Sequence, residues 1–381
     1  MILVVVGIDV VDFPRDVDGI TVEWLRERLR EKAPLAAGRL RSFQAEPVAK
    51  QGMTSLAHVL TLDYDDNPGH LPRKLLAKFS LDSAPVKAAL AGNRGFEREV
   101  AFYTRFGEDP GITTPRCHWA QFDAGEGRCG LLLDYVEDTR ITDVFTGQVK
   151  DIESVTAALA PFHARWWNSP ALKSTLPGMA PFMLEPILVR LRLAIDNMRG
   201  VYRDQVGETL IAAVAFWLDN ALFLAEKEQR QPQTLCHGDL HREQILFPQS
   251  AMGPIFVFDW QLSGHDTAAT DLAYLLVSGL RPEQRQAHER GIVEAYYADL
   301  IRYGVQNYSI DQLWQSYRLG IARQAMFYMT VFAIDDVAPV LDWWSNDEKR
   351  QNFSFWDVSC LWVSQALKDH EVLPRLAAEL R

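Results

Sequence analysis

Residues 236–262 read CHGDLHREQILFPQSAMGPIFVFDWQL, and this stretch decides the fold. Residues 245–247 and 255–258 are β-branched or aromatic, as strand residues usually are, and the Pro, Ser and Gly residues between them are typical of a turn. The stretch therefore predicts a β-hairpin. Asp239 precedes the first strand and Asp259 follows the second, so we expect both carboxylates at the rim of the hairpin.

Two carboxylates in this arrangement suit phosphoryl transfer. One carboxylate orients the attacking hydroxyl and accepts its proton, and another holds magnesium over the nucleotide phosphates. We assign the first, catalytic role to Asp239 and the second to Asp259. Few other side chains are needed, because the protein mainly supplies position and counter-charge to a group that is already reactive.

A metal site is a competing interpretation of the same stretch. His237, Asp239 and His241 alternate in the sequence, so on a strand they would share one face and could ligate zinc. This pattern is the basis for an alternative hypothesis, a zinc hydrolase. Further clusters of His or Cys would support it, but only His265 lies nearby in the sequence.

Three strings resemble a known superfamily: HGDLH at 237–241, FDWQ at 258–261 and DLA at 271–273. They look like the aminoglycoside phosphotransferase and choline kinase superfamily, and the Asp-Trp-Gln form is similar to its ecdysteroid-kinase-like branch. The resemblance implies an α+β, bilobal protein-kinase-like fold with a small antiparallel-sheet N-lobe and a large, mainly helical C-lobe. It also implies transfer of the ATP γ-phosphate, with Mg²⁺, to a hydroxyl of a small aminoglycoside-, choline- or steroid-like acceptor.

The resemblance extends to individual residues of the stretch. It implies that Asp239 is the catalytic base, Asp259 the magnesium-binding acid, His237 the packing histidine of the loop, and Asp271 a buried acid that braces it. Gln244 stands where the family usually has asparagine. Its amide oxygen can still reach a cation, but one methylene further out. This departure leaves open a second alternative, a kinase-like protein that binds nucleotide without catalysis.

The resemblance also requires a nucleotide-binding lobe before residue 236. A turn at Gly52, Thr54 and Ser55 lies between two strand-like segments, where a glycine backbone can approach phosphate and hydroxyls can donate to it. Lys78 ends the apolar run 75–78 and is the candidate to contact the α and β phosphates.

The partner of this lysine is expected on the following helix. Residues 95–103 have helical periodicity, and the resemblance implies that Glu99 of this helix, in preference to Glu97, is the acid that pairs with the lysine. Residues 131–136 form an apolar strand that the resemblance makes the hinge, with backbone groups around Asp134 to Val136 meeting the adenine edge. His163, in the later helical segment 158–167, is interpreted as a structural histidine.

The periodicity of the whole chain divides it into three parts. Strand patterns concentrate between 41 and 136, and helical patterns dominate 151–230 and 282–381. We therefore expect an N-terminal extension and helix at 1–40, with Thr21 as the N-cap, a nucleotide-binding N-lobe at 41–136, and a helical C-lobe at 137–381 that carries the catalytic loop and the acceptor site.

Composition limits the partners and the compartment. The chain has 381 residues and a formal net charge of −11, which argues against a nucleic-acid partner. Its four cysteines have no paired spacing, which favours a reducing, cytoplasmic compartment. The apolar start at 2–8 is far below the ~20 residues of a membrane span, so we expect no membrane partner. Nothing in the sequence indicates an oligomeric state.

The acceptor is expected between the catalytic loop and the late helices. Peptide kinases are regulated by phosphorylation of a long segment after the metal-binding acid, and an arginine before the base pairs with that phosphate. Here only twelve steps separate Asp259 from Asp271, and Gly238 precedes Asp239. A protein substrate is therefore disfavoured. Aromatic and acidic side chains that suit a cation, a sugar or a sterol ring gather late in the chain. They are Trp314, Tyr317, Phe327, Tyr328, Asp335, Asp336, Trp343, Trp344 and Asp347.

Overall fold

The computed structural model describes residues 13–49, 51–52, 54–65, 71–82, 94–142, 147–175, 178–250, 253–334 and 356–380. The chain divides into two compact units. The first comprises Met1–Glu108 and Pro115–Glu137, and the second comprises Asp109–Thr114 and Asp138–Arg381. The short return segment 109–114 therefore belongs to the second unit although it lies within the sequence of the first.

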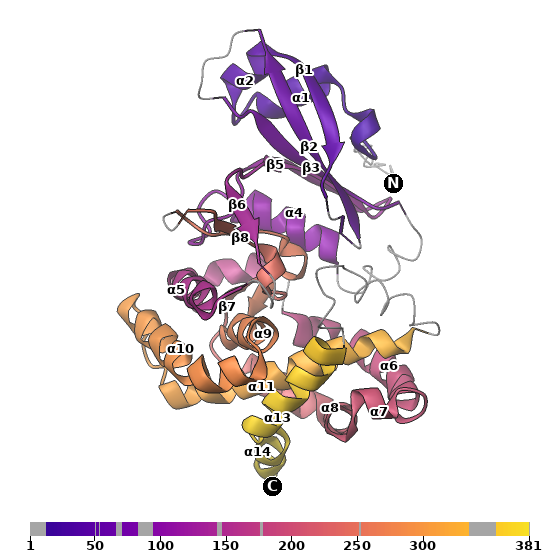
Figure 1. Cartoon of the computed structure of the whole chain (residues 1–381), viewed down its shortest axis with the longest axis vertical. Helices are drawn as coiled ribbons and strands as arrows, with labels where there is room; N and C mark the ends of the chain where they lie inside the picture. The colour runs from indigo at the N-terminus through magenta and orange to yellow at the C-terminus, as the bar shows by residue number, and fades with distance from the viewer. Residues whose placement is uncertain are drawn as a thin grey trace, which may run out of the picture. The chain divides into compact units, whose positions relative to one another are not determined.

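The first unit is built on an antiparallel sheet of five strands in the order β1-β2-β3-β5-β4 (Figure 1). Its elements in chain order are a 3-10 turn at Val17–Gly19, α1 (Val22–Leu29), α2 (Pro34–Arg39), β1 (Leu40–Pro47), β2 (Ser55–Tyr64), β3 (Lys74–Ser80), α4 (Gly95–Arg105), β4 (Cys117–Asp123) and β5 (Arg128–Asp134). Thr21 caps α1 as expected, because its hydroxyl accepts a hydrogen bond from the Trp24 amide at 3.1 Å.

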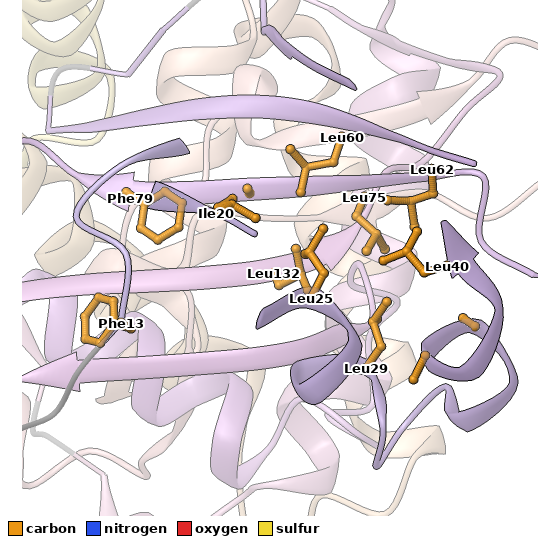
Figure 2. Packing of buried hydrophobic residues seen from close by; sticks show 13 residues of the cluster. Phe13, Ile20, Leu25, Leu29, Leu40, Leu60, Leu62, Leu75, Phe79 and Leu132 are labelled. Carbon is orange, nitrogen blue, oxygen red and sulfur yellow. The ribbon is translucent and has the colours of Figure 1, made fainter. Parts of the chain in front are cut away.

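The helices before the sheet pack into the same core as its strands. Figure 2 shows Leu25 and Leu29 of α1 beside Leu60, Leu75 and other apolar side chains of the sheet. All of these side chains are buried, and burying one such side chain contributes about 1.5–3 kcal/mol. The described part of residues 1–40 is thus integrated into the first unit.

Strand periodicity decides which side chains of β3 face this core. Successive side chains of a strand point to opposite faces. Leu75, Ala77 and Phe79 belong to the core cluster, so Lys78 points to the other face of the sheet. The helix α4 contacts β4 and β5, and its buried Glu99 meets Lys78 on that face.

The second unit is mainly helical, with two small antiparallel sheets (Figure 1). Its first elements are β6 (Thr139–Ile141), α5 (Val149–Arg165), a 3-10 turn at Pro170–Ser174, α6 (Met179–Arg199), α7 (Arg203–Val206), α8 (Glu208–Gln229), β7 (Thr234–Cys236), a 3-10 turn at Arg242–Gln244, β8 (Ile245–Pro248), β9 (Phe256–Val257), a 3-10 turn at Trp260–Leu262 and β10 (Gly264–Asp266). The remaining elements are α9 (Ala269–Gly279), α10 (Pro282–Arg302), α11 (Ile310–Met329), a 3-10 turn at Thr330–Ala333, a π-helix at Trp356–Trp362, α13 (Val363–Asp369) and α14 (Val372–Glu379).

The predicted hairpin is present in the second unit. Strand β8 pairs with β9 in antiparallel register, with Ile245 opposite Val257 and Leu246 opposite Phe256. Strand β6 pairs with the other edge of β8. Strand β7, which precedes the hairpin in the sequence, pairs with β10, which follows it. Asp239 therefore follows β7, and Asp259 directly follows Phe258 at the end of β9.

The core of the second unit surrounds α9 (Figure 1). Every residue of α9 is buried, and the helix packs mainly against α11. By length and composition α8 could cross a bilayer, but core helices of soluble proteins meet the same criterion. The Trp217 side chain of α8 is fully buried and donates a hydrogen bond to the Ala322 carbonyl of α11 at 3.1 Å. The expected fold class, a small antiparallel-sheet lobe and a large helical lobe, is confirmed.

Candidate active site

A buried ion pair crosses from the sheet of the first unit to α4. The Lys78 ammonium donates to both carboxylate oxygens of Glu99, at 2.8 and 2.9 Å. The Glu99 side chain is 1% exposed and that of Lys78 is 11% exposed. Glu97, the other acid on this helix, pairs instead with Arg94 at its surface. The structure thus brings together the lysine and the acid that the sequence paired.

The turn that the sequence predicts to cover the phosphates lies at the start of β2. Gly52 is not in the left-handed region, and a Cβ there would meet only ordinary contacts, so the fold itself does not require glycine at this position. The Thr54 carbonyl accepts from the Leu81 amide at 2.9 Å, and Ser55 is buried as the first residue of the strand. Their roles toward phosphate remain predictions.

The expected hinge follows β5. The Asp134 amide donates to the Arg116 carbonyl at 2.8 Å, and one Asp134 carboxylate oxygen lies 2.6 Å from the His118 ring. Tyr135 is exposed beside Lys74, and Val136 leads out of the sheet. This segment is anchored at its start, and its contact with an adenine edge remains a prediction.

The catalytic loop of the second unit is shaped by a glycine that no other residue can replace without strain. Gly238 has φ +85°, and a Cβ at this position would lie 2.3 Å from the Leu262 carbonyl oxygen. The loop therefore passes close to the turn that follows Asp259. This close approach holds the Asp239 segment against the end of the hairpin.

Asp271 clamps the backbone of that loop from α9. Its carboxylate accepts from the His237 amide at 2.7 Å and from the Gly238 amide at 2.8 Å, and the His163 ring lies 3.3 Å away. Burial alone would raise the pKa of Asp271, but the hydrogen bonds and charges of these neighbours outweigh it and lower the pKa. The clamp is therefore ionised, as a brace for two backbone donors requires.

His237 is held in one tautomer. Its Nε2 lies 2.9 Å from the Phe258 carbonyl, which can only accept, so Nε2 carries the proton. Its Nδ1 then accepts from the Asp239 amide at 3.3 Å. Because β7 ends at Cys236, His237, Asp239 and His241 do not share a strand face, and the geometry that motivated the zinc hypothesis is not found.

A second group of residues, all of types that can ligate a metal, is also engaged in other contacts. Ligand atoms of His163, Cys236 and Asp271 lie within 4.8 Å of one another and are buried. His163 is engaged by Asp271 and by the Tyr296 hydroxyl at 2.6 Å, in the structural role expected for it. Burial raises the pKa of the Cys236 thiol well above its ordinary value, which disfavours the thiolate that a metal would need.

Asp239 lies where a base can work. Its side chain is 27% exposed, and its carboxylate is 3.9 Å from the His241 Nε2 and lies near the Tyr274 hydroxyl. Burial raises the pKa of Asp239, and nearby Asp259 raises it further, whereas His241, Tyr274 and His237 lower it; the net shift is upward. A higher pKa makes the carboxylate a better proton acceptor.

Asp259 adopts an unusual backbone conformation, φ 65° and ψ 62°, in the left-handed region. The Gln244 amide nitrogen donates to its carboxylate at 3.2 Å. Gln244 directly precedes β8 and Asp259 follows β9, so the two side chains come from the two arms at the open end of the hairpin. The structure thus brings the two predicted metal-site residues together.

These donors fit a magnesium ion in type. Mg²⁺ prefers carboxylate and carbonyl oxygens and keeps several waters. Asp259 offers a carboxylate and Gln244 an amide oxygen, and the amide nitrogen of Gln244 orients the carboxylate rather than competing for the ion. The extra methylene of Gln244 is therefore compatible with a place beside Asp259.

Tyr274 is a site residue that the sequence did not reveal. It lies in α9, whose apolar sequence indicates core, and it is 6% exposed. One signal could have found it, because Asp271 and Tyr274 are three residues apart and so share a helix face. The Asp271 side chain meets the backbone of the catalytic loop, and the Tyr274 side chain lies near Asp239 of the same loop.

The late aromatic residues separate into two groups. Trp314 and Tyr317 pack against His370, and the Tyr317 hydroxyl donates to Glu289 at 2.5 Å, so they belong to a core cluster. Phe327 and Tyr328 lie at the other end of α11, where Tyr328 packs edge-to-face on Tyr274. The other predicted acceptor residues, Asp335, Asp336, Trp343, Trp344 and Asp347, lie outside the described residues.

Comparison with known proteins identifies one family model. The model described as "Uncharacterized oxidoreductase dhs-27" matches residues 91–354. No curated protein matches the chain.

Solved structures show the same fold. A protein assigned as an aminoglycoside phosphotransferase from Ralstonia eutropha is 12% identical, with 92% of this chain and 97% of that chain covered and a TM-score of 0.55. An ethanolamine kinase from Plasmodium vivax is 13% identical, with 93% and 89% covered and a TM-score of 0.53. At such identities the likeness concerns the fold alone.

Proposed function

The chain belongs to the family described as "Uncharacterized oxidoreductase dhs-27" and has the fold of the aminoglycoside phosphotransferase and choline kinase superfamily, and from this premise we propose that it is a small-molecule O-phosphotransferase that uses ATP and magnesium. The observation that carries the proposal is the environment of Asp239. A partly exposed carboxylate with a raised pKa lies beside a second acid, on a loop clamped by Asp271.

The chemistry assigns each residue a task. The acceptor hydroxyl oxygen forms a bond to the γ-phosphorus, the bond between that phosphorus and the β–γ bridging oxygen breaks, and ADP leaves with the electron pair. Asp239 accepts the hydroxyl proton. Lys78, held by Glu99, neutralises charge on the α and β phosphates. Gly52, Thr54 and Ser55 cover the phosphates, and backbone groups at Asp134 to Val136 bind the base.

Magnesium would be held by Asp259, with the amide oxygen of Gln244 beside it. When bound, the ion would neutralise charge on the phosphates. The two side chains lie on the two arms of the hairpin, and rotation of the Gln244 amide, whose nitrogen faces Asp259, would turn its oxygen toward the ion.

An oxidoreductase is the activity that the family description suggests, and the topology argues against its usual dinucleotide site. The chain has one Gly-x-Gly-x-x-Gly, at residues 125–130. A dinucleotide-binding motif of this kind joins a strand of a parallel sheet to a helix. Here it joins and enters the antiparallel strands β4 and β5, and every strand pair in the described ranges is antiparallel.

The test of the proposed base is Asp239→Asn. The amide keeps the shape of the side chain but cannot accept the proton, so turnover should fall by about 10²–10⁴-fold while nucleotide affinity stays within about twofold. Transfer is measured as the mass gain of one phosphoryl group over a panel of aminoglycosides, amino alcohols, sugars and steroids, and affinity is measured by calorimetry with the non-hydrolysable analogue AMP-PNP.

A matched control is Asp299→Asn, a carboxylate on α10 that is 27% exposed, like that of Asp239. It should leave both quantities unchanged. An Asp239→Asn variant that transfers phosphate at the wild-type rate would overturn the assignment of the base. Nucleotide binding without transfer to any acceptor in the wild-type protein would favour the non-catalytic alternative.

A further inference from the structure

A small cavity lies beside the catalytic loop, within the helical unit. Its walls include Gly238 of the loop, Tyr274 of α9, and Arg323, Gln324 and Phe327 of α11. Its volume is ≈ 20 Å³, which is room for about one water-sized polar group. The cavity therefore adjoins the residue before Asp239 and is too small for a whole acceptor.

One wall of the cavity carries a polar atom without a partner. The Gln324 side chain is 3% exposed, and its amide oxygen has no hydrogen bond to any residue that the structure describes. Its amide nitrogen donates to the Tyr328 hydroxyl at 3.3 Å, which fixes the side chain. Buried carbonyl oxygens are almost always paired, so this acceptor is suited to a donor from a bound molecule.

One hydrogen bond and a ring contact connect this wall to the surroundings of Asp239. Gln324 donates to the Tyr328 hydroxyl, the Tyr328 ring packs edge-to-face on Tyr274, and Tyr274 lies near Asp239. A group bound at Gln324 would therefore lie against the side chains that pack beside the proposed base. Binding at the cavity and alignment of the reacting hydroxyl are linked through two phenols.

The charges around the cavity select an uncharged donor. Arg323 is the charged residue that lines it within the described part of the chain, and its guanidinium is bonded to Asp266 and Thr270. Because Arg323 is already paired with Asp266 and none of the described residues that line the cavity is a carboxylate, an ammonium group would be buried there without a counter-charge. A neutral hydroxyl can donate to the Gln324 oxygen without this penalty.

We propose that this cavity is a subsite for a second, uncharged hydroxyl of the acceptor, so that the acceptor class is a neutral diol or polyol. This inference rests on the proposed phosphotransferase function. Gln324 is then the specificity-determining residue. An acceptor with a quaternary ammonium or an ether at the same place would leave the Gln324 oxygen buried and unpaired.

Four ring compounds of the same skeleton test the proposal on the full chain. They are trans-1,2-cyclohexanediol, its monomethyl ether, cyclohexanol and trans-2-aminocyclohexanol. Ligand-observed NMR titration, with and without Mg²⁺ and AMP-PNP, gives their dissociation constants. The diol should bind about tenfold more tightly than the ether, because only the diol has a second donor. The amine should bind more weakly than the diol.

Two substitutions at Gln324 make the assignment specific. In Gln324→Leu the preference for the diol over the ether should fall to within about twofold. Gln324→Glu keeps the size of the side chain and serves if the leucine variant does not fold. Its carboxylate should reverse the order of affinities, so that the amine binds more tightly than the diol. Gln315→Leu is the matched control, because it makes the same change at the exposed Gln315–Glu379 contact of the same helix.

The outcomes separate the subsite from the proposed function. Equal affinity of diol and ether, or no binding of either, would show that the cavity holds water only and would overturn the subsite. A diol preference that survives Gln324→Leu would overturn the role of Gln324. Phosphoryl transfer is followed separately by mass. Transfer without a preference for the diol would support the phosphotransferase and overturn the subsite. A preference for the diol without transfer would support the subsite and overturn the phosphotransferase.

Discussion

Tyr274 and burial have opposite effects on the pKa of Asp239. Burial raises this pKa, and the nearby Tyr274 hydroxyl lowers it. Tyr274→Phe removes the hydroxyl, so the pKa should rise further. A base must be deprotonated to accept a proton, so the acidic limb of the kcat/KM profile should move to higher pH. The same limb in Tyr303→Phe, an exposed tyrosine, should stay in place; an unmoved limb in Tyr274→Phe would contradict the proposed contact.

The Lys78–Glu99 pair gives a prediction on stability. Lys78→Met removes the ammonium but leaves the Glu99 carboxylate, which is 1% exposed, and the loss should be about 3–5 kcal/mol in urea denaturation. The double variant Lys78→Met with Glu99→Leu should recover most of it. Lys74→Met is the control, because its pair with Glu137 is exposed and its loss should leave the stability nearly unchanged. A double variant no more stable than the single one would be the contrary result.

At the residue scale, a pair of interacting side chains was easier to predict than a chain of contacts through several side chains. The superfamily resemblance paired Lys78 with Glu99 rather than Glu97, and the structure has that pair, whereas periodicity predicted only the strand and the helix that carry the two residues. The chain from Asp239 through Tyr274 to Gln324 joins three elements that are distant in sequence. No periodicity distinguishes such a tyrosine or glutamine from an ordinary core residue, so the contacts appear only when the elements are packed.

At the scale of elements, the catalytic loop depends on one backbone position. Gly238→Ala places a Cβ 2.3 Å from the Leu262 carbonyl in addition to the cost of a positive φ, and should destabilise the protein by roughly 3 kcal/mol or more. Gly207→Ala is a matched control, because Gly207 also has a positive φ but open space around it, and it should cost about 1 kcal/mol. Equal losses of stability would show that the close approach to Leu262 is unimportant.

The hairpin was predictable and the clamp beneath it was not. Two β-branched or aromatic runs around a turn predict β8 and β9 directly. That Asp271 reaches back over thirty residues to two backbone amides follows from the packing of α9 under the loop. The superfamily resemblance implied a bracing acid there, but the identity of its donors needed coordinates.

At the scale of the whole molecule, removal of magnesium should be visible in stability. Mg²⁺ with AMP-PNP at about 100 times its dissociation constant should stabilise the protein by ~2.7 kcal/mol, and EDTA should remove most of that gain. Asp259→Asn should respond to the nucleotide but not to EDTA, because it lacks the charged ligand. Thermal unfolding midpoints check this, and an EDTA effect equal to that of wild type would contradict the metal-binding role of Asp259.

The fold class was predictable because the two halves of the chain have different periodicities. Alternation marks the sheet unit and helical spacing marks the other. The packing of residues 13–39 into the core of the sheet was not expected, since short helices with few apolar positions give no signal of their partner. The return of residues 109–114 to the second unit likewise depends on distant contacts, such as the Val257 amide with the Thr113 carbonyl at 2.9 Å.

The left-handed backbone at Asp259 has an evolutionary consequence. Among side chains other than glycine, asparagine and aspartate tolerate this conformation best. A change from acid to amide there would preserve the local architecture while deleting a negative charge. An inactive descendant could thus arise in one mutational step and still be indistinguishable in outline from its ancestor, so resemblance of shape within this family is a poor guide to which members turn over substrate.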